Sequence, residues 1–177
     1  MNISPGPSFG VLVYLGRHSR QSFYVRELAT TLSMSVGVIS GYLTSLREMD
    51  LVTSEKRGRT LLYRANISHP LVREAKIFCT LLELSPLISS LKARASRAIL
   101  FGSCAEGEDT FESDIDLFVE TEDRSAASLI LSRCEDTISR KISPLIVDSG
   151  EAIQLKVRDR PLYERIQQGK VLIGERL

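Results

Sequence analysis

The chain has few cysteines, no long apolar run and almost no net charge, and each absence excludes a class of protein. Three cysteines, Cys79, Cys104 and Cys134, are spread over 177 residues without a CxxC pair. This pattern predicts neither a disulfide framework nor a zinc site, and it fits a reducing compartment. The longest apolar runs, such as Gly10–Gly16, are too short to cross a bilayer. With 43% hydrophobic residues and a net charge of +1, the composition is that of a folded protein rather than a disordered one.

The start of the chain also lacks a targeting pattern. The first ten residues, MNISPGPSFG, have no basic segment followed by an apolar one, so the sequence predicts no signal peptide. We therefore expect a cytoplasmic protein without a membrane part.

The small net charge hides an asymmetry. Residues 1–70 carry 8 Lys and Arg against 4 Asp and Glu, whereas residues 71–177 carry 15 against 18. Within Phe101–Asp123 there are nine acidic residues and no basic one. A basic first part favours a polyanionic partner and a dense acidic patch favours a metal ion, although two solvated surfaces of opposite charge would explain the same counts.

The first part of the chain shows a characteristic order of elements. Apolar residues at helical spacing, a polar break and two strand-like runs are found in turn. These segments are a helix over Pro7–Arg17, a second helix with Val25, Leu28, Ala29 and Leu32 on one face, a break at Ser33–Ser35, a third helix from the N-cap Ser35 to about Met49, and strands over Leu51–Glu55 and Thr60–Arg64. The turn between the strands, Lys56–Arg59, contains three cations and one glycine.

The stretch RELATTLSMSVGVISGYLTSLREMDLV resembles the winged helix-turn-helix fold of prokaryotic regulators, over roughly residues 8–66. The resemblance implies that the helix after Ser35 enters the major groove of DNA and that the basic turn, or wing, meets phosphates or the minor groove. The predicted DNA contacts are Ser35, Gly37, Ser40, Thr44 and Arg47 on the helix and Lys56, Arg57 and Arg59 on the wing. Because the solvent face of the helix has no Asn, Gln or Arg before Arg47, we expect phosphate contacts to dominate. A protein–protein module is the alternative, and the cationic wing favours DNA.

A connector follows. Residues 66–70 form a break, since the residue before Pro70 is biased away from helix. The segment from Leu71 to about Leu91 has helical apolar spacing, in which Pro86 is predicted to open a second helical piece.

The second part of the chain carries residues suited to phosphate chemistry. A buried strand over Ala98–Phe101 ends at Gly102 and Ser103, and after ten more residues comes the acidic pair Asp114 and Asp116. In a strand the two aspartates share a face, where they repel each other unless a divalent cation lies between them. Glycine and serine before a short helix form a nest of N–H groups for phosphate. A phosphate cradle beside paired aspartates that hold Mg²⁺ is what metal-assisted phosphoryl transfer requires.

The stretch ILFGSCAEGEDTFESDIDLFV resembles the signature of the DNA polymerase beta-like nucleotidyltransferases, which is an apolar residue, G-S, a spacer of about ten and D-x-D. It is especially similar to the minimal nucleotidyltransferase (MNT) group, over roughly Ala98–Gly174. The resemblance implies that Asp114 and Asp116 are the catalytic and metal-binding residues, with Mg²⁺ or Mn²⁺, and that Gly102 and Ser103 bind the phosphates of an NTP, with ATP expected. The implied reaction transfers NMP, expected to be AMP, to an acceptor and releases pyrophosphate. In the MNT group the acceptor can be a protein hydroxyl on a HEPN-type partner, with this chain as the antitoxin.

Two departures from the family pattern keep other hypotheses open. The third carboxylate of the family is expected near Ser143, and only Asp148 and Glu151 follow a few residues later. Glu106 stands where the MNT group usually has arginine. Both departures favour a second hypothesis, a transcriptional regulator whose nucleotidyltransferase-like domain only senses nucleotide or dimerises. A third hypothesis, a small-molecule modifier resembling aminoglycoside nucleotidyltransferases, agrees poorly with a fused DNA-binding module.

The sequence predicts an α+β protein with a winged helix-turn-helix domain at 1–67, a helical connector at 68–95 and a small mixed-sheet nucleotidyltransferase domain at 96–177. The remaining predicted elements are helices over Ser125–Ser139, Glu151–Val157 and Pro161–Gln168 and strands over Lys141–Val147 and Val171–Ile173. The expected partners are DNA, a nucleotide and a HEPN-type protein. A homodimer is expected if DNA half-sites are used.

Overall fold

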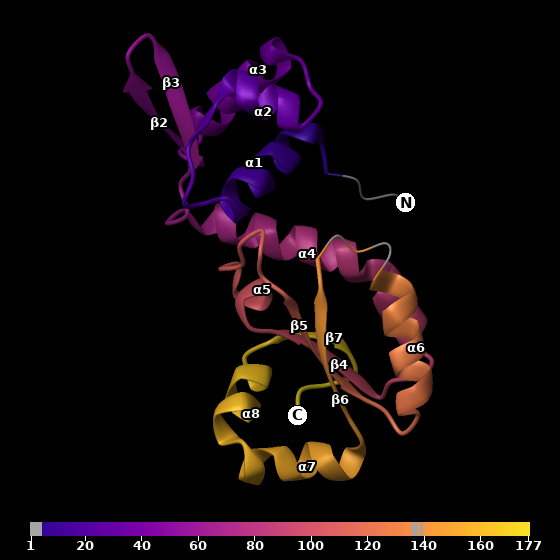
Figure 1. Ribbon diagram of the computed structural model, residues 1–177. Helices are drawn as coiled ribbons and strands as arrows, with labels where there is room; N and C mark the ends of the chain where they lie inside the picture. The colour runs from indigo at the N-terminus through magenta and orange to yellow at the C-terminus, as the bar shows by residue number, and fades with distance from the viewer. Residues whose placement is uncertain (1–4, 136–137, 139) are drawn as a thin grey trace. The chain divides into compact units, whose positions relative to one another are not determined.

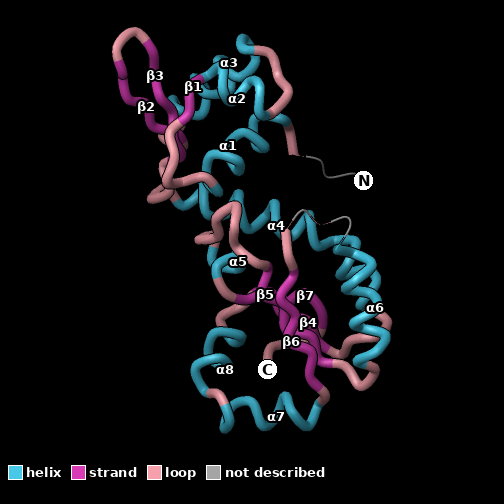
Figure 2. The backbone as a smooth tube through the Cα atoms, in the orientation of Figure 1, coloured by secondary structure: helices cyan, strands magenta, loops and turns pink. Residues whose placement is uncertain are grey.

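The chain forms two compact units. The computed structural model describes residues 5–135, 138 and 140–177. The N-terminal unit is Met1–Lys76, and the C-terminal unit is Ile77–Leu177. Each unit contains helices and one sheet, as Figures 1 and 2 show.

The N-terminal unit has the winged helix-turn-helix fold that the sequence predicts. Its elements are α1 (Pro7–Arg17), β1 (Phe23–Tyr24), α2 (Val25–Thr31), α3 (Val36–Glu48), β2 (Val52–Arg57) and β3 (Thr60–Ala65). The three strands form one antiparallel sheet in the order β1-β3-β2. The two-residue strand β1 was not predicted, because a run of two residues has no periodicity to detect.

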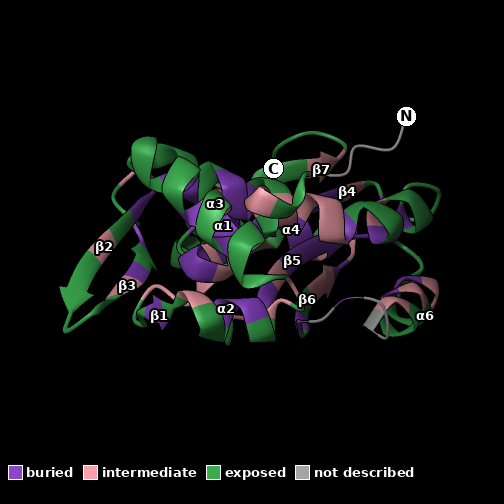
Figure 3. Ribbon diagram, turned by 90° about the horizontal axis from the view of Figure 1, so that it is seen from above, coloured by how far each residue is buried: buried purple, intermediate pink, exposed green. Residues whose placement is uncertain are grey.

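Helix α3 begins and packs as its sequence dictates. Ser35 is the N-cap, and its Oγ accepts a hydrogen bond from the backbone N of Val38 at 3.2 Å. The side chains of Ile39, Leu43 and Leu46 are buried on one face, and α3 contacts both α1 and α2 along it. Figure 3 shows the buried and exposed faces of these helices. The opposite face of α3 is exposed to solvent.

The wing is a hairpin with a two-residue turn. Arg57 pairs with Thr60, so only Gly58 and Arg59 lie between the strands. Gly58 has φ +64°, a left-handed conformation that glycine adopts without the steric cost of a Cβ. Strand β2 continues to Arg57, so Lys56 and Arg57 belong to the strand rather than to the turn.

Helix α4 (Pro70–Leu91) begins in the N-terminal unit and ends in the C-terminal unit. The prediction that Pro86 opens a second helical piece is wrong, because Pro86 lies inside one continuous helix. A proline removes one intrahelical hydrogen bond, but Leu84 and Leu87 on either side of it are buried, and this packing stabilises the helix across the missing bond. In the described part of the chain, no helix is long and apolar enough to span a membrane.

The C-terminal unit is built on a mixed sheet, as predicted. Its elements after α4 are β4 (Arg97–Phe101), α5 (Ser103–Glu106), β5 (Ile115–Glu120), α6 (Arg124–Glu135), β6 (Ile142–Val147), α7 (Ser149–Arg158), α8 (Arg160–Gln167) and β7 (Lys170–Ile173). The strand order is β6-β5-β4-β7, and only β5 and β6 run parallel. The end of the helix predicted over Ser125–Ser139 includes residues 136, 137 and 139, which lie outside the described residues.

Helices cover both faces of this sheet. One apolar cluster joins the sheet to α4 and α6 and includes Leu87, Leu117 and Leu131. A second cluster, with Phe118 and Ile166, joins the opposite face to α7 and α8. Because neighbouring residues of a strand face opposite sides, the sequence of β5 decides which of its side chains lies on the α7–α8 face.

Candidate functional site

The acidic pair lies at the start of β5. Asp114 precedes the strand by one residue, and Asp116 pairs with Phe101 of β4 on one side and Ser143 of β6 on the other. Asp116 shares its face of the sheet with Phe118, which packs in the cluster of α7 and α8. The pair therefore lies at one end of the sheet, on the side that α8 covers.

Gly102 contacts Asp116. Gly102 has φ +67°, and a Cβ at this position would collide with Asp116 Oδ2. Only glycine satisfies both conditions, because any side chain would be strained and would displace the carboxylate. The next residue, Ser103, opens α5, the short helix that the sequence predicts after Gly102 and Ser103. The structure thus brings the glycine-serine pair and the aspartate pair together.

Two cations that sequence reasoning did not find complete the cluster. Arg165 on α8 places Nη2 3.6 Å from Asp116 Oδ2, and its Cζ lies 5.6 Å from the ring centroid of Phe101. Lys141 Nζ lies 3.4 Å from Asp114 Oδ2. A signal existed for Lys141, since it lies two residues before Ser143 and immediately before β6. The sequence offers no comparable signal for Arg165, because its position depends on how α8 packs.

Burial and charge act in opposite directions on Asp116. Burial raises the pKa of the Asp116 carboxyl most strongly, the Arg165 guanidinium lowers it, and the charge of Asp114 raises it again, so that the pKa lies above its ordinary value. The ionised form of Asp116 is therefore disfavoured unless a cation lies beside it. A cation that approached both carboxylates would be stabilised by the same charges.

The donor set fits a magnesium ion that shares its shell with a substrate. Among residues 5–135, 138 and 140–177, no group of three or more His, Cys, Asp and Glu side chains is placed to hold a metal. Mg²⁺ in proteins commonly takes one or two carboxylates and completes its shell with phosphate oxygens and water. Asp114 and Asp116 are such a pair, and the absent side chain of Gly102 leaves Asp116 Oδ2 uncovered.

In the part of the chain that the structure describes, no carboxylate takes the place of the third family aspartate. Ser143 lies opposite Asp116 in the parallel register, and it is exposed. Asp148 and Glu151 lie beyond the other end of β6, about 16 Å further along an extended strand. Both are engaged there, since they form the N-terminal capping box of α7 and bind Arg124 Nη2.

Glu106 is the last residue of α5 and is exposed. The positive charges beside the acidic pair come instead from Arg165 and Lys141, two residues far from it in the sequence.

A buried ionic network holds the segment between Gly102 and Asp114. Arg140, only 6% exposed, donates from Nη1 to Asp109 Oδ2 at 2.9 Å and to Cys104 Sγ at 3.3 Å. Its Nη2 donates to Thr80 Oγ1 and Glu83 Oε2, both at 2.8 Å. Arg140 thereby links α4, α5 and the following loop immediately before Lys141. Sequence reasoning missed this residue, because a single arginine gives no sign of burial.

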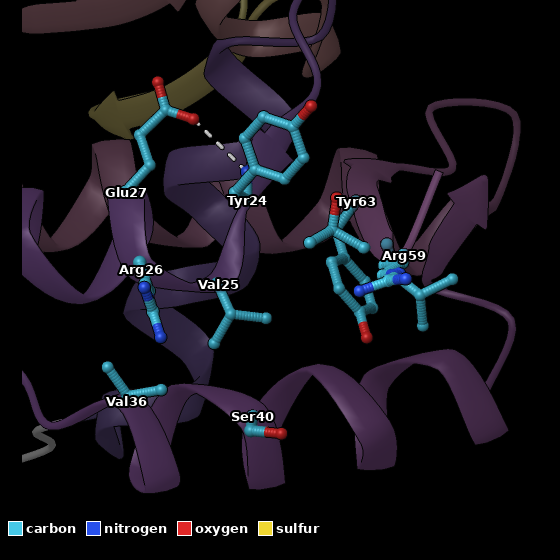
Figure 4. Close-up of a pocket in the computed structure, with 10 residues that line it drawn as sticks. Tyr24, Val25, Arg26, Glu27, Val36, Ser40, Arg59 and Tyr63 are labelled. Atoms are coloured by element: carbon cyan, nitrogen blue, oxygen red, sulfur yellow. Dashed lines mark hydrogen bonds between the residues drawn. The ribbon is translucent and has the colours of Figure 1, made fainter. Parts of the chain in front are cut away.

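The winged-helix unit has an open groove of about 920 Å³ between the start of α2, α3 and the start of β3. Figure 4 shows its lining, with Val36 and Ser40 on α3 facing Val25 and Arg26 on α2. The lining residues are Tyr24, Val25, Arg26, Glu27, Val36, Ser40, Arg59, Thr60, Leu61 and Tyr63.

The structure places the predicted DNA contacts in two groups. Ser40 and Arg59 line the groove. The others are exposed on α3 or the wing outside its lining: Ser35, Gly37, Thr44, Arg47, Lys56 and Arg57. Sequence reasoning missed the groove residues Tyr24, Arg26 and Tyr63. The sequence places Arg26 near the start of a helix, but it does not show which strand packs beside that turn.

The comparison with family models agrees with the fold of the C-terminal unit. A family model described as "Polymerase beta, Nucleotidyltransferase" matches residues 87–176, half of the chain. The chain belongs to the polymerase beta nucleotidyltransferase family. The comparison with curated proteins gave no match.

Two solved structures are similar to parts of the chain. A mutant of ZitR from Lactococcus lactis has 20% identity, with 49% of this chain and 58% of that chain covered at a TM-score of 0.38. The adhesin competence repressor AdcR from Streptococcus pyogenes has 20% identity, with 51% of this chain and 70% of that chain covered at a TM-score of 0.38. The match to ZitR thus spans less than two thirds of that protein.

Proposed function

We propose that this chain is a DNA-binding nucleotidyltransferase that transfers NMP from an NTP to an acceptor hydroxyl. The observation that carries the proposal is the cluster at the start of β5, where Asp114 and Asp116 lie beside Gly102 with Arg165 and Lys141 at their outer oxygens. Two carboxylates, two cations and a bare backbone position are the groups that a metal–triphosphate complex requires.

Each residue has a role in this proposal. Asp114 and Asp116 would hold Mg²⁺ or Mn²⁺, which when bound neutralises charge on the phosphates. Gly102 lets the chain approach the phosphates closely, and Ser103 adds a hydroxyl donor. Arg165 and Lys141 exchange their contacts with the aspartates for contacts with phosphate oxygens, since the carboxylates then face the metal.

The chemistry is a single displacement. The acceptor oxygen forms a bond to the α-phosphorus, the bond from that phosphorus to the bridging oxygen breaks, and pyrophosphate leaves. The proton of the acceptor hydroxyl passes to solvent, because none of the described residues places a third carboxylate beside Asp116 to receive it. Positioning and charge supply much of the rate enhancement in such transfers, so a slow reaction remains available without a base.

The proposal extends to the identity of the acceptor and of the nucleotide. The similarity to the MNT group makes ATP the first nucleotide to test and a protein hydroxyl, on a HEPN-type partner, the first acceptor. In that role the chain would be an antitoxin that also binds DNA through its winged helix. The domain division into 1–67, 68–95 and 96–177 remains a prediction alongside these proposals.

One observation favours a second function. Ser143 occupies the position beside Asp116 where the family has its third carboxylate, and serine is neither a good magnesium ligand nor a general base. On this alternative the chain is a DNA-binding regulator whose C-terminal unit senses nucleotide without transferring it, or only dimerises.

A labelling experiment separates the two functions. The full chain is incubated with Mg²⁺ or Mn²⁺ and each NTP labelled at the α-phosphate, with and without host lysate, beside a variant carrying Asp114→Asn and Asp116→Asn. We expect labelled product that is absent with the double variant. Metal-dependent NTP binding without transfer would support the sensor instead, and the absence of both would exclude any nucleotide function.

A further inference from the structure

The groove of the winged-helix unit is lined by two arginines, by Glu27 and by two valines, of which Val36 is exposed. Arg26 lies on α2 and Arg59 at the tip of the wing, while Val25 is the first residue of α2 and Val36 the first residue of α3 (Figure 4). Val36 is 48% exposed, although it begins the helix that carries the predicted DNA contacts. The two arginines suit a polyanion and the valines suit an apolar group carried by that polyanion.

Two hydroxyl groups of α3 and its N-cap have hydrogen-bond partners within the helix itself. Ser35 Oγ accepts from Val38 N at 3.2 Å, and Thr44 Oγ1 donates to Ser40 O at 2.9 Å. Each hydroxyl therefore has a local partner, which limits what it can offer to a base edge. Before Arg47, the sequence of α3 contains no side chain able to form two parallel hydrogen bonds to a base.

The major groove of DNA displays one apolar feature that is specific to a base, the C5-methyl group of thymine. Aliphatic side chains recognise this methyl by contact, and they need no hydrogen-bonding group to do so. In a duplex with thymine opposite Val36, the phosphates would pair with Arg26 and Arg59. The thymine methyl group would contact the exposed valine. No other base edge in the major groove offers an apolar group to it.

We propose that the chain selects its DNA through thymine methyl groups, with Val36 as the contacting residue. The inference rests on the proposed DNA binding and goes beyond it by naming the feature that is read. Arg26, Arg59 and the wing then supply affinity without sequence preference, whereas Val36 supplies the preference.

The test removes only the methyl group. Duplexes bound by the full chain are first selected from a random library. Each thymine of the selected site is then replaced by deoxyuridine, which keeps every hydrogen-bonding group. Loss of one buried methyl contact is expected to weaken binding about fourfold at one or more positions.

A matched pair of variants identifies the contacting residue. Val38 is also in α3 and is 43% exposed, but it does not line the groove. With Val36→Ala the penalty for deoxyuridine should disappear, and with Val38→Ala it should persist. Both substitutions are at exposed positions of a helix that alanine favours, and circular dichroism checks that both variants fold.

The outcomes are distinct. A selected site that tolerates deoxyuridine at every position, or a penalty that survives Val36→Ala, would overturn the inference while DNA binding itself stood. A chain that binds no duplex at all would overturn the proposed DNA binding, and the inference with it.

Discussion

Ser143 lies directly beside Asp116 in the parallel register of β5 and β6, on the face of the sheet that α8 covers. A side chain at position 143 therefore projects next to the carboxylate that the proposed reaction depends on. This relationship makes position 143 the place where a general base can be restored.

Ser143→Asp should increase the rate of nucleotidyl transfer. A carboxylate beside Asp116 can accept the proton of the acceptor hydroxyl, and positioned bases contribute about 100-fold or more in other enzymes. Ser143→Asn, which has the same size without the charge, serves as the control in the α-phosphate labelling assay. Equal rates for the Asp and Asn variants would mean that position 143 does not reach the reacting atoms.

Arg165→Gln should weaken NTP binding by about tenfold, because a charge-assisted hydrogen bond to phosphate is lost. Arg160→Gln is the matched control, since Arg160 lies on the same helix and its Nε pairs with Glu164 at 2.8 Å rather than with the site. Isothermal titration with a nonhydrolysable ATP analogue and Mg²⁺ measures both. The same loss in the two variants would assign the effect to the net charge of α8.

Asp116→Asn should stabilise the metal-free protein at neutral pH. The pKa of Asp116 lies above its ordinary value of 3.8 in the folded chain, so folding favours the protonated carboxyl. The protonated carboxyl therefore contributes to the stability of the folded state below the ordinary pKa. This contribution is lost as the pH rises through the raised pKa. The advantage of the Asn variant should therefore be present at pH 7 and should shrink as the pH falls toward the ordinary value.

Thermal unfolding in EDTA across this range measures the difference for Asp116→Asn. The gain should be small, since the side chain is 31% exposed and solvent screens part of the effect. A variant less stable than the natural chain at pH 7 would show that the ion pair with Arg165 outweighs burial.

Arg140→Met should cost about 3–5 kcal/mol in the free energy of unfolding, because the buried Asp109 loses the charge that faces it. Arg124→Met also removes a cation with two acidic partners, but this group is partly exposed, and exposed pairs contribute about 0–1 kcal/mol. Urea denaturation of the two variants gives the comparison. Similar losses would contradict the view that burial decides the size of the effect.

Arg59→Gln should reduce the salt dependence of DNA binding. Each phosphate contact contributes about 0.9 to the slope of log K against log salt, so the slope should fall by about that amount. Arg20→Gln has the same loss of charge at an exposed residue of this unit outside the groove and the wing. An unchanged slope for Arg59→Gln would remove the wing tip from the proposed interface.

The sequence was sufficient for the order of the elements other than β1 and for the fold of both units. Helices such as α3 combine an N-cap at Ser35 with a buried stripe at Ile39, Leu43 and Leu46, and such local signals survive folding. The prediction at Pro86 failed because a local rule was overridden by packing on both sides of the proline. Local signals thus predict elements well, except where tertiary contacts oppose them.

The candidate site could be predicted only in part. Gly102 and Asp116 stand in a motif of fixed spacing, and their contact follows from the strands that carry them. Arg165 and Arg140 reach their partners from elements far away in the chain, and no spacing in the sequence announces such contacts. The role of Arg165 as a nucleotide contact remains a proposal for the experiments above.

The burial and the hydrogen bonds of Cys104 make the reactivity of its thiol a measure of local opening. The thiol is fully buried, it donates to the carbonyl oxygen of Asp114 at 3.4 Å, and it accepts from Arg140 at 3.3 Å. Because the side chain is buried, a thiol reagent reaches it only when the structure around α5 opens. The labelling rate of Cys104, read by mass spectrometry with and without nucleotide, therefore reports how often this region opens in the native protein.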